Sequence, residues 1–189
     1  MEKNIIIVGV GGQGTLLASR ILGAAATIKG YDVKVSEVHG MAQRGGSVIT
    51  YVKYGKKVYS PIVAKGTADI ILAFEMLEGL RYLPYLKKDG VLIVNTQTID
   101  PMPVITGAME YPTDIIEKIK EKNIRVITLD ALQKAVEAGS TKAVNVALIG
   151  ALAASSPIEK EVFEQALEQT VPPKFLDLNK KAFELGYNA

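Results

Sequence analysis

The chain contains no cysteine and only one histidine, His39. Without cysteine it cannot form a disulfide, hold an iron–sulfur cluster through thiolates or supply a cysteine nucleophile. One histidine is too few for the usual ligand sets of zinc or non-haem iron. No Walker-type lysine follows a glycine loop, and no serine sits in a nucleophile-elbow motif. We therefore predict no metal site and no catalytic residue in this chain.

Charge and long apolar runs are also scarce. The formal net charge is +2 over 189 residues, and no basic tract is present, so we expect no nucleic-acid partner. The longest apolar stretch, residues 143–154, is too short to cross a bilayer, and the N-terminus has no signal-peptide pattern. We expect a soluble, cytoplasmic protein. With 48% hydrophobic residues, the chain can bury the core of one domain, residues 1–189.

Glycine, by contrast, is concentrated near the N-terminus. An apolar run at residues 5–8 predicts a buried strand, and the motif GVGGQG follows at residues 9–14. Apolar periodicity over residues 16–28 predicts a helix, and residues 31–35 predict a second strand. This βαβ pattern favours a right-handed crossover. The glycines allow close approach to a ligand, and the helix N-terminus offers N–H groups to an anion.

The spacing of Gly9, Gly11 and Gly14 also matches the dinucleotide-binding fingerprint, and Glu37 lies near the position of the ribose-binding acid. A free-standing dinucleotide-binding oxidoreductase is therefore one alternative. Another is that the glycines only allow the helix to pack tightly on the strand. A standard dinucleotide domain would continue into a second crossover helix, but here a second glycine-rich loop follows, SEVHGMAQRGG at residues 36–46.

Two cationic side chains lie in that second loop. Arg44 is suited to bidentate capture of a carboxylate or phosphate, and its alternative role is an interchain or interdomain salt bridge. His39 either contacts a ligand or only shapes the loop through ordinary hydrogen bonds.

The rest of the chain alternates strands and helices. After the second loop, strands at 48–52 and 58–59 predict an antiparallel hairpin at the sheet edge, serving either edge protection or docking. Residues 98–113 form a long proline-containing connection, either a functional loop or an arm that covers a neighbour. The other predicted strands are 69–74, 91–94 and 125–128. The other predicted helices are one from Met76 that Asp89-Gly90 ends, then 114–122, 131–138, 142–152, 158–169 and one from Pro172-Pro173 to Gly186.

These elements predict an α/β fold that is Rossmann-like, with a mainly parallel, doubly wound sheet and an antiparallel hairpin addition. Glu75 and Asn95 follow two of the parallel strands. Each is expected either to line the crevice beside the first glycine loop or to cap a following helix. Asn145 lies in an apolar segment and needs a hydrogen-bond partner, either a neighbouring strand end or the glycine loops.

The sequence resembles the gamma-type subunits of the 2-oxoacid:ferredoxin oxidoreductases, in particular the small beta subunit of the indolepyruvate branch. The resemblance rests on residues 9–14, on residues 36–47 and on DPMPV at residues 100–104, and it extends through Asn145 and Gly150 over nearly the whole chain. Other gamma-type members carry a shorter loop ending in Arg-Gly-Gly. The wording of residues 39–43 therefore points to the indolepyruvate branch.

The resemblance implies a CoA-dependent oxidative decarboxylation of an aryl-pyruvate to an aryl-acetyl-CoA, with reduction of ferredoxin. It places thiamine diphosphate and 4Fe–4S clusters in a large alpha subunit, so this chain would be an enzyme subunit that is inactive alone. Its loops would close the thiamine site or hold coenzyme A phosphates, with Arg44 as the anion contact and Gln13 and His39 as polar contacts. A purely structural subunit is the remaining alternative. The candidate binding residues are Gly9, Gly11, Gly12, Gln13, Gly14, His39, Gln43, Arg44, Gly45 and Gly46.

Overall fold

The protein, described by a computed structural model over residues 2–40 and 45–189, is built on a six-stranded sheet of order β2-β3-β1-β4-β5-β6. The predicted site residues Gln43 and Arg44 lie outside the described residues. The strands are β1 (Lys3–Val10), β2 (Asp32–His39), β3 (Ser47–Gly55), β4 (Ala68–Ala73), β5 (Leu86–Asn95) and β6 (Arg125–Leu129). Within the described ranges, no helix is both long and apolar enough to span a membrane.

Four of the strands, β1, β4, β5 and β6, pair in parallel. Their side chains alternate between two cores, because successive residues of a strand point to opposite faces. Ile5 and Ile7 of β1 belong to one core, and Ile6 and Val8 belong to the other. All four are buried. Burial on both faces explains why these strands are continuous apolar runs, as the sequence predicted.

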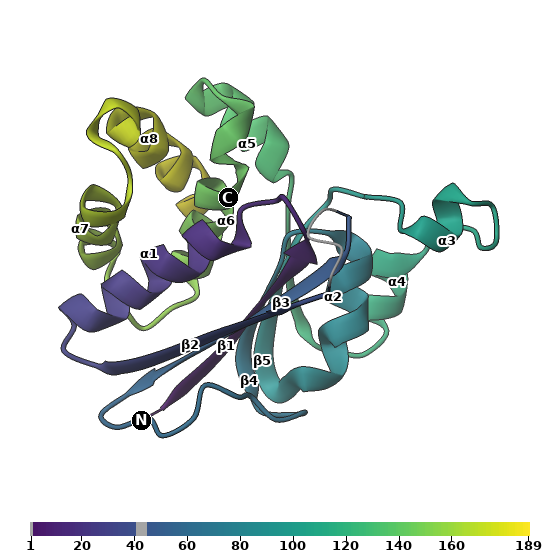
Figure 1. The fold of residues 1–189 in the computed structure, drawn as a ribbon, viewed down its shortest axis with the longest axis horizontal. Helices are drawn as coiled ribbons and strands as arrows, with labels where there is room; N and C mark the ends of the chain where they lie inside the picture. The colour runs from purple at the N-terminus through teal and green to yellow at the C-terminus, as the bar shows by residue number, and fades with distance from the viewer. Residues whose placement is uncertain (1, 41–44) are drawn as a thin grey trace.

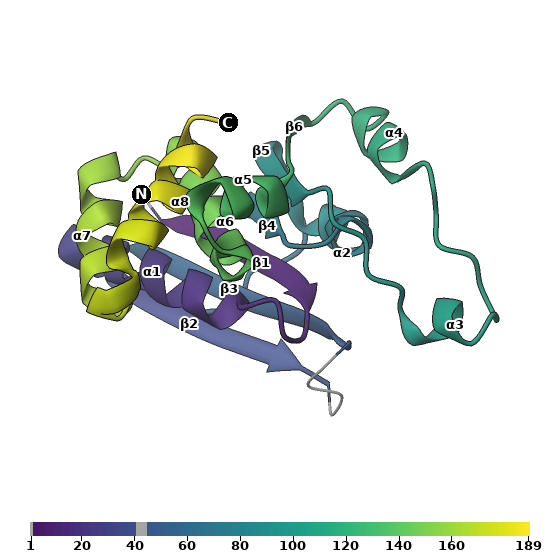
Figure 2. The ribbon, with the colours of Figure 1, turned by 90° about the horizontal axis from the view of Figure 1, so that it is seen from above.

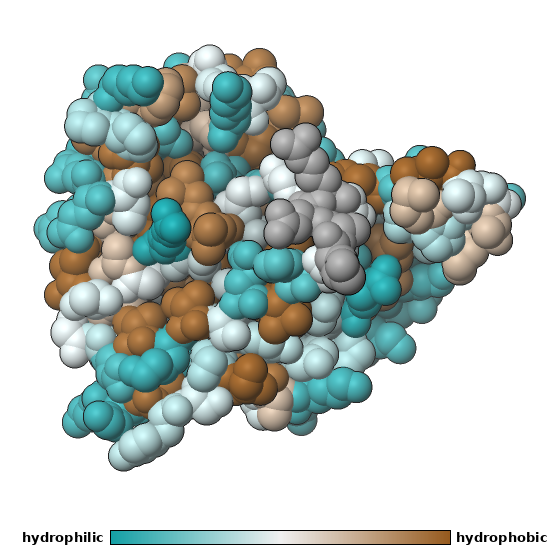
Figure 3. Space-filling model, in the orientation of Figure 1, coloured by the Kyte–Doolittle hydropathy of each residue, from teal (hydrophilic) through white to brown (hydrophobic). Residues whose placement is uncertain are grey.

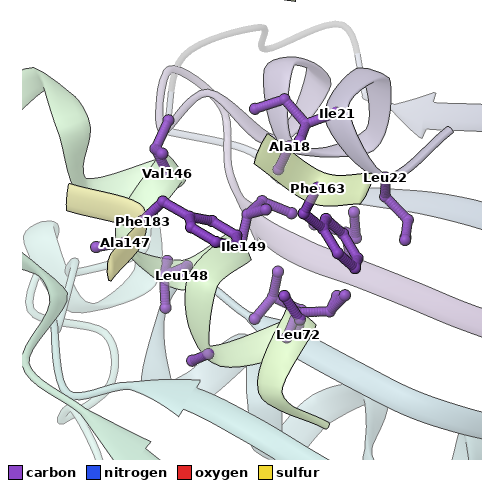
Figure 4. Packing of buried hydrophobic residues seen from close by; sticks show 14 of the residues in the cluster. Ala18, Ile21, Leu22, Leu72, Val146, Ala147, Leu148, Ile149, Phe163 and Phe183 are labelled. Carbon is purple, nitrogen blue, oxygen red and sulfur yellow. The ribbon is translucent and has the colours of Figure 1, made fainter. Parts of the chain in front are cut away.

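Helices cover both faces of the sheet, which confirms the doubly wound fold (Figures 1 and 2). The first core packs under α1 (Thr15–Ile28), α5 (Ala131–Ala138), α6 (Val144–Ala154), α7 (Lys160–Thr170) and α8 (Leu176–Tyr187). The second packs under α2 (Met76–Tyr82) and α4 (Ile115–Lys120). Figure 4 shows side chains of α1, α6, α7 and α8 meeting in the first core, where the rings of Phe163 and Phe183 stack at 6.1 Å.

The antiparallel hairpin is confirmed at the sheet edge, but its strands differ from those predicted. β2 pairs with β3, and β3 pairs antiparallel with β1, so β3 lies between the two strands of the predicted βαβ unit. The predicted strand at residues 58–59 is wrong, since Val58 lies outside any strand and donates its N–H to Asp32. Residues 36–39 of the expected second loop are strand, because the β2–β3 ladder continues to the pair His39–Val48.

Two helix ends also differ from the sequence prediction. The α2 helix ends at Tyr82 rather than at Asp89-Gly90, because Pro84 lacks the N–H that would continue it, and β5 starts at Leu86, before the predicted strand 91–94. Gly186 does not end α8, which continues to Tyr187. A Cβ on Gly186 would lie 1.8 Å from the Ala147 carbonyl oxygen, so this glycine lets α8 cross α6 at backbone contact.

Residues 98–113 leave the body of the molecule between β5 and α4 and return to it (Figures 1 and 2). The segment was predicted to lack regular structure, but it contains one short helix, α3 (Met102–Ile105). None of its residues is buried. We call residues 98–113 the arm.

Candidate functional site

The two glycine loops meet at the carboxyl end of β1. Gly11 donates its N–H to the Gly46 carbonyl at 2.9 Å, and Gly45 donates to the Gly11 carbonyl at 3.4 Å. The contact follows from the register of the sheet, where Val10 at the end of β1 pairs with Ser47 at the start of β3. The predicted convergence of the two loops is therefore present in the described residues Gly11, Gly45 and Gly46.

The first loop needs glycine for both conformation and space. Gly12 and Gly14 have φ of +101° and +84°, a region that other residues rarely adopt. A Cβ on Gly9 would lie 2.8 Å from Gln13 Oε1 and 2.9 Å from Phe74 Cβ. Gly14 caps α1 without a side-chain bond, and the first turn of α1 contains no acidic residue. The N-terminal N–H groups of α1 therefore have no competing anion within its first turn.

The side chain of Gln13 braces the first loop against the sheet. Its Oε1 accepts from Val10 N at 2.7 Å, and its Nε2 donates to the Phe74 carbonyl at 3.0 Å and to Gln97 Oε1 at 3.2 Å. The amide is thus bonded on both sides within the chain. A contact between Gln13 and a ligand stays a prediction, whereas its bracing role follows from these bonds.

Two asparagines contact backbone groups at the same edge of the sheet. Asn95, at the end of β5, donates to the Phe74 carbonyl at 3.0 Å and accepts at 3.1 Å from the N–H of Ala131, the first residue of α5, whose N-cap is Asp130. Asn145 of α6 places Nδ2 3.5 Å from the Gly14 carbonyl. Of the two partners expected for Asn145, a strand end or the glycine loops, the structure shows a contact with the first glycine loop.

Glu75 is a buried carboxylate, 1% exposed, two residues after the end of β4. Its Oε2 accepts from Glu78 N at 2.9 Å, so it caps α2, as one of the two interpretations predicted. Its Oε1 accepts from Ile99 N at 3.2 Å and from the Tyr111 hydroxyl at 2.5 Å. Burial, together with this carboxylate, raises the pKa of Tyr111 well above its ordinary value, so the phenol remains a hydrogen donor.

Sequence analysis missed a second buried carboxylate, Glu78, which is 4% exposed. Its Oε2 accepts from Ser47 Oγ at 2.5 Å, and its Oε1 accepts from Arg81 Nε at 3.1 Å. Ser47 comes directly after Gly46, so Glu78 fixes the point where the second loop enters β3. The signal in the sequence is faint, because an acidic residue in the first turn of a helix is common there for electrostatic reasons.

Two clefts flank the first loop. One has a volume of about 440 Å³ and is lined by Gly12, Gln13, Gly14 and by Thr141 and Lys142 before α6. The other, of about 280 Å³, is lined on the opposite side by Gly11, Glu37 and His39, among others. His39 Nδ1 lies 3.1 Å from the Gly40 carbonyl oxygen. Lys142 was not predicted as a site residue, and it supplies a cation to the larger cleft.

The dinucleotide alternative finds little support in this geometry. In the standard fold, the strand that carries the ribose-binding acid lies directly beside the first strand. Here β3 separates β2 from β1. The Glu37 carboxylate also accepts a hydrogen bond from Thr50 Oγ1 at 3.1 Å, which occupies one of its oxygens within the chain.

The residues of this chain do not fit a cluster or a bound metal. The sequence has no cysteine, and in the part of the chain that the structure describes no three His, Asp or Glu side chains gather to hold an ion.

A Rossmann-like sheet with a glycine-rich rim defines this chain as an α/β domain. The chain belongs to the pyruvate ferredoxin/flavodoxin oxidoreductase family, whose model matches residues 4–189. The protein "Indolepyruvate oxidoreductase subunit IorB" from Thermococcus kodakarensis is 48% identical over 193 residues, covering 100% of this chain and 96% of that protein. The predicted family resemblance is thus confirmed.

Two further relatives extend the comparison. The crystal structure of the keto/oxoacid ferredoxin oxidoreductase gamma subunit from Geobacter sulfurreducens has a TM-score of 0.74 at 27% identity, over 98% of this chain and 96% of that one. "Ketoisovalerate oxidoreductase subunit VorA" from Methanothermobacter marburgensis is 30% identical over 98% of this chain but only 36% of its own length. In VorA the matching region is therefore one part of a longer polypeptide.

Proposed function

We propose that this chain is the small subunit of a 2-oxoacid:ferredoxin oxidoreductase of the indolepyruvate type. A large alpha subunit carries the thiamine diphosphate and the 4Fe–4S clusters. The complex oxidatively decarboxylates an aryl-pyruvate such as indolepyruvate and transfers the acyl group to coenzyme A. The released electrons reduce ferredoxin. The full-length similarity to a subunit named for indolepyruvate supports this choice within the family.

One observation carries the proposal: the hydrogen bonds between Gly11 and Gly46 and between Gly45 and Gly11. They join both glycine loops into a single rim of the sheet. In open α/β folds, ligands bind outside the carboxyl ends of the strands, which is where this rim lies. A glycine-rich rim with a cleft on each side of its first loop is suited to a ligand or cofactor presented by a partner.

Coenzyme A, when bound, supplies the thiol that accepts the acyl group. The groups of this chain that fit its phosphates are the N–H groups at the start of α1 and the Lys142 ammonium. Arg44, outside the described residues, is the predicted bidentate anion contact. His39, Gln43, Gly45 and Gly46 complete the second loop. In this proposal the chain binds and encloses coenzyme A, and the partner performs the proton and electron transfers.

Reconstitution tests the proposal. The chain is co-expressed anaerobically with the large thiamine- and cluster-bearing subunit encoded in the same genome, and ferredoxin reduction is followed spectroscopically with indolepyruvate and coenzyme A. We expect activity that needs both subunits and coenzyme A, and aryl-acetyl-CoA as product. Turnover by the small chain alone, or a complex that accepts 2-oxoglutarate or pyruvate in preference to indolepyruvate, would contradict it.

A further inference from the structure

Both ends of the arm bond to the same buried side chain, that of Glu75. The Glu75 carboxylate accepts from Ile99 N where the arm leaves the body and from the Tyr111 hydroxyl where it returns. Glu75 is 1% exposed and also caps α2. A buried acceptor shared by both ends closes the arm into a loop with a defined exit and return.

The tip of the arm is ordered by its own hydrogen bonds. Val104 N and Ile105 N donate to the Pro101 carbonyl, and Ala108 N and Met109 N donate to the Pro103 carbonyl. Gly107, with φ of +74°, allows the chain to reverse after α3. The tip therefore has a shape before anything binds it, which reduces the conformational entropy lost on docking.

Several apolar side chains of the arm are exposed in the part of the chain that the structure describes. Met102, Ile105 and Met109 are 64%, 65% and 65% exposed. Figure 3 shows hydrophobic residues on the projecting part of the surface that corresponds to the arm in Figure 1. Methionine side chains adapt to irregular apolar surfaces and are enriched in the cores of protein interfaces. An ordered segment that buries none of its own residues is best explained by a partner that buries them.

A groove runs between the arm and α2. It has a volume of about 570 Å³ and is lined mainly by apolar side chains, including Leu77, Leu80, Val104 and Met109. The charged groups of the arm are Asp100 and Glu110, both acidic. Arg81, also on the groove, is paired with Glu78. The complementary surface is therefore apolar at its centre and basic at its edge.

We propose that the arm docks the large alpha subunit, with Met102, Ile105 and Met109 packing on it and the groove receiving one of its apolar segments. This inference rests on the proposed function. The arm starts from the same rim as the glycine loops, since Phe74, just before Glu75, accepts the hydrogen bond from Gln13. In VorA the matching region belongs to a longer chain, which favours the rest of the oxidoreductase over a second copy as the occupant.

Binding and activity are measured separately in the test. The arm variant carries Met102→Ser, Ile105→Ser and Met109→Ser, and the control carries Tyr59→Ser and Ile62→Ser, which are 88% and 54% exposed outside the arm. Affinity for the purified large subunit is measured by sedimentation. We expect at least a tenfold rise in Kd for the arm variant, no change for the control, and unchanged turnover number at saturating small subunit. Equal Kd values for the arm variant and the wild type would overturn the proposal.

A crosslinking measurement keeps the proposal testable if the triple variant folds poorly. Benzoylphenylalanine is placed at Ile105 or, as control, at Ile62 in the co-expressed complex. We expect a crosslink to the large subunit only from position 105; a crosslink to a second copy of this chain, or none, overturns the docking arm. Arm-dependent binding without indolepyruvate oxidation would contradict the proposed substrate and leave the arm supported.

Discussion

A methyl group on Gly14 would lie 2.6 Å from Nδ2 of Asn145, a residue far along the chain in α6. The contact joins the glycine loop at the start of α1 to the buried helix α6. Gly12, two residues earlier, also has a left-handed backbone, but no heavy atom of the described residues lies within 4 Å of the position of an added Cβ. Gly12 requires glycine for its backbone conformation alone, whereas Gly14 requires glycine both for its conformation and for the space beside Asn145.

The first prediction uses that pair. Gly12→Ala is expected to lower the free energy of unfolding by about 1 kcal/mol, from backbone strain alone. Gly14→Ala adds a collision with Asn145 and is expected to cost about 1–3 kcal/mol more. Urea titrations of both variants measure the difference. Asn145→Ala combined with Gly14→Ala should recover part of the excess, and equal losses for the two glycines would contradict the packing argument.

A second prediction concerns the crossing of α6 and α8. Gly186→Ala would press a methyl group against the Ala147 carbonyl oxygen, where only 1.8 Å is available, and we expect a loss of about 3 kcal/mol or more. The control is Gly23→Ala inside α1, whose Cβ would lie 3.9 Å from Val33 Cγ1. Because alanine favours helix more than glycine does, this control should stabilise by about 0.5–1 kcal/mol. Thermal unfolding of both variants checks the opposite signs.

A third prediction is a pH dependence of stability centred on Asp69. Burial alone would raise its pKa, but hydrogen bonds from Lys87 Nζ at 2.5 Å and Asn4 N at 2.8 Å, with Lys3 nearby, hold the pKa below its usual range. The folded pKa is the lower one, so this stabilisation is complete above the unfolded value of about 3.9 and is lost as pH falls through the folded pKa. Asp69→Asn should be less stable at neutral pH and lose less stability on acidification. Asp114→Asn, at an exposed pair, is the control.

Much of the fold could be predicted because the parallel strands are continuous apolar runs between capped helices. The capped helix Ala131–Ala138 was predicted with its cap, Asp130, whose Oδ1 accepts from Gln133 N at 2.9 Å. The position of β3 could not be predicted, because strand order depends on pairing between distant segments rather than on local periodicity. The same limit explains why Gly186 was predicted to end a helix, since its role becomes visible only where α8 crosses α6.

Some features of the candidate site could likewise be predicted from the sequence, and others could not. The glycines of both loops could be identified because left-handed backbone and close approach select glycine. The inward bonding of Gln13 could not, since a polar side chain beside a glycine loop suits ligand contact and internal bracing equally well. Glu78 was missed because its partner, Ser47, is brought to it only by the β1–β3 register.

A fourth prediction tests the dinucleotide alternative on the isolated chain. A ligand that binds only the folded state raises its stability by about 2.7 kcal/mol at a hundredfold excess over Kd. Because β3 separates Glu37 from β1, we expect NAD, NADP and FAD to leave the melting temperature unchanged at millimolar concentration. A saturable rise with any of them, abolished by Glu37→Ala, would restore the dinucleotide interpretation.

A fifth prediction distinguishes ligand contact from bracing in the assembled complex. If Arg44 binds a coenzyme A phosphate, Arg44→Ala should raise the KM for coenzyme A about tenfold, since a charge-assisted hydrogen bond contributes about 1.5–3 kcal/mol. The turnover number and the KM for indolepyruvate should change little. Arg44→Lys should give an intermediate KM, because it keeps the charge and loses the bidentate geometry. Arg20→Ala, on an exposed position of α1, is the control. Unchanged constants for both substrates in Arg44→Ala would instead favour a purely structural subunit, whose second loop supports the partner without touching the ligand.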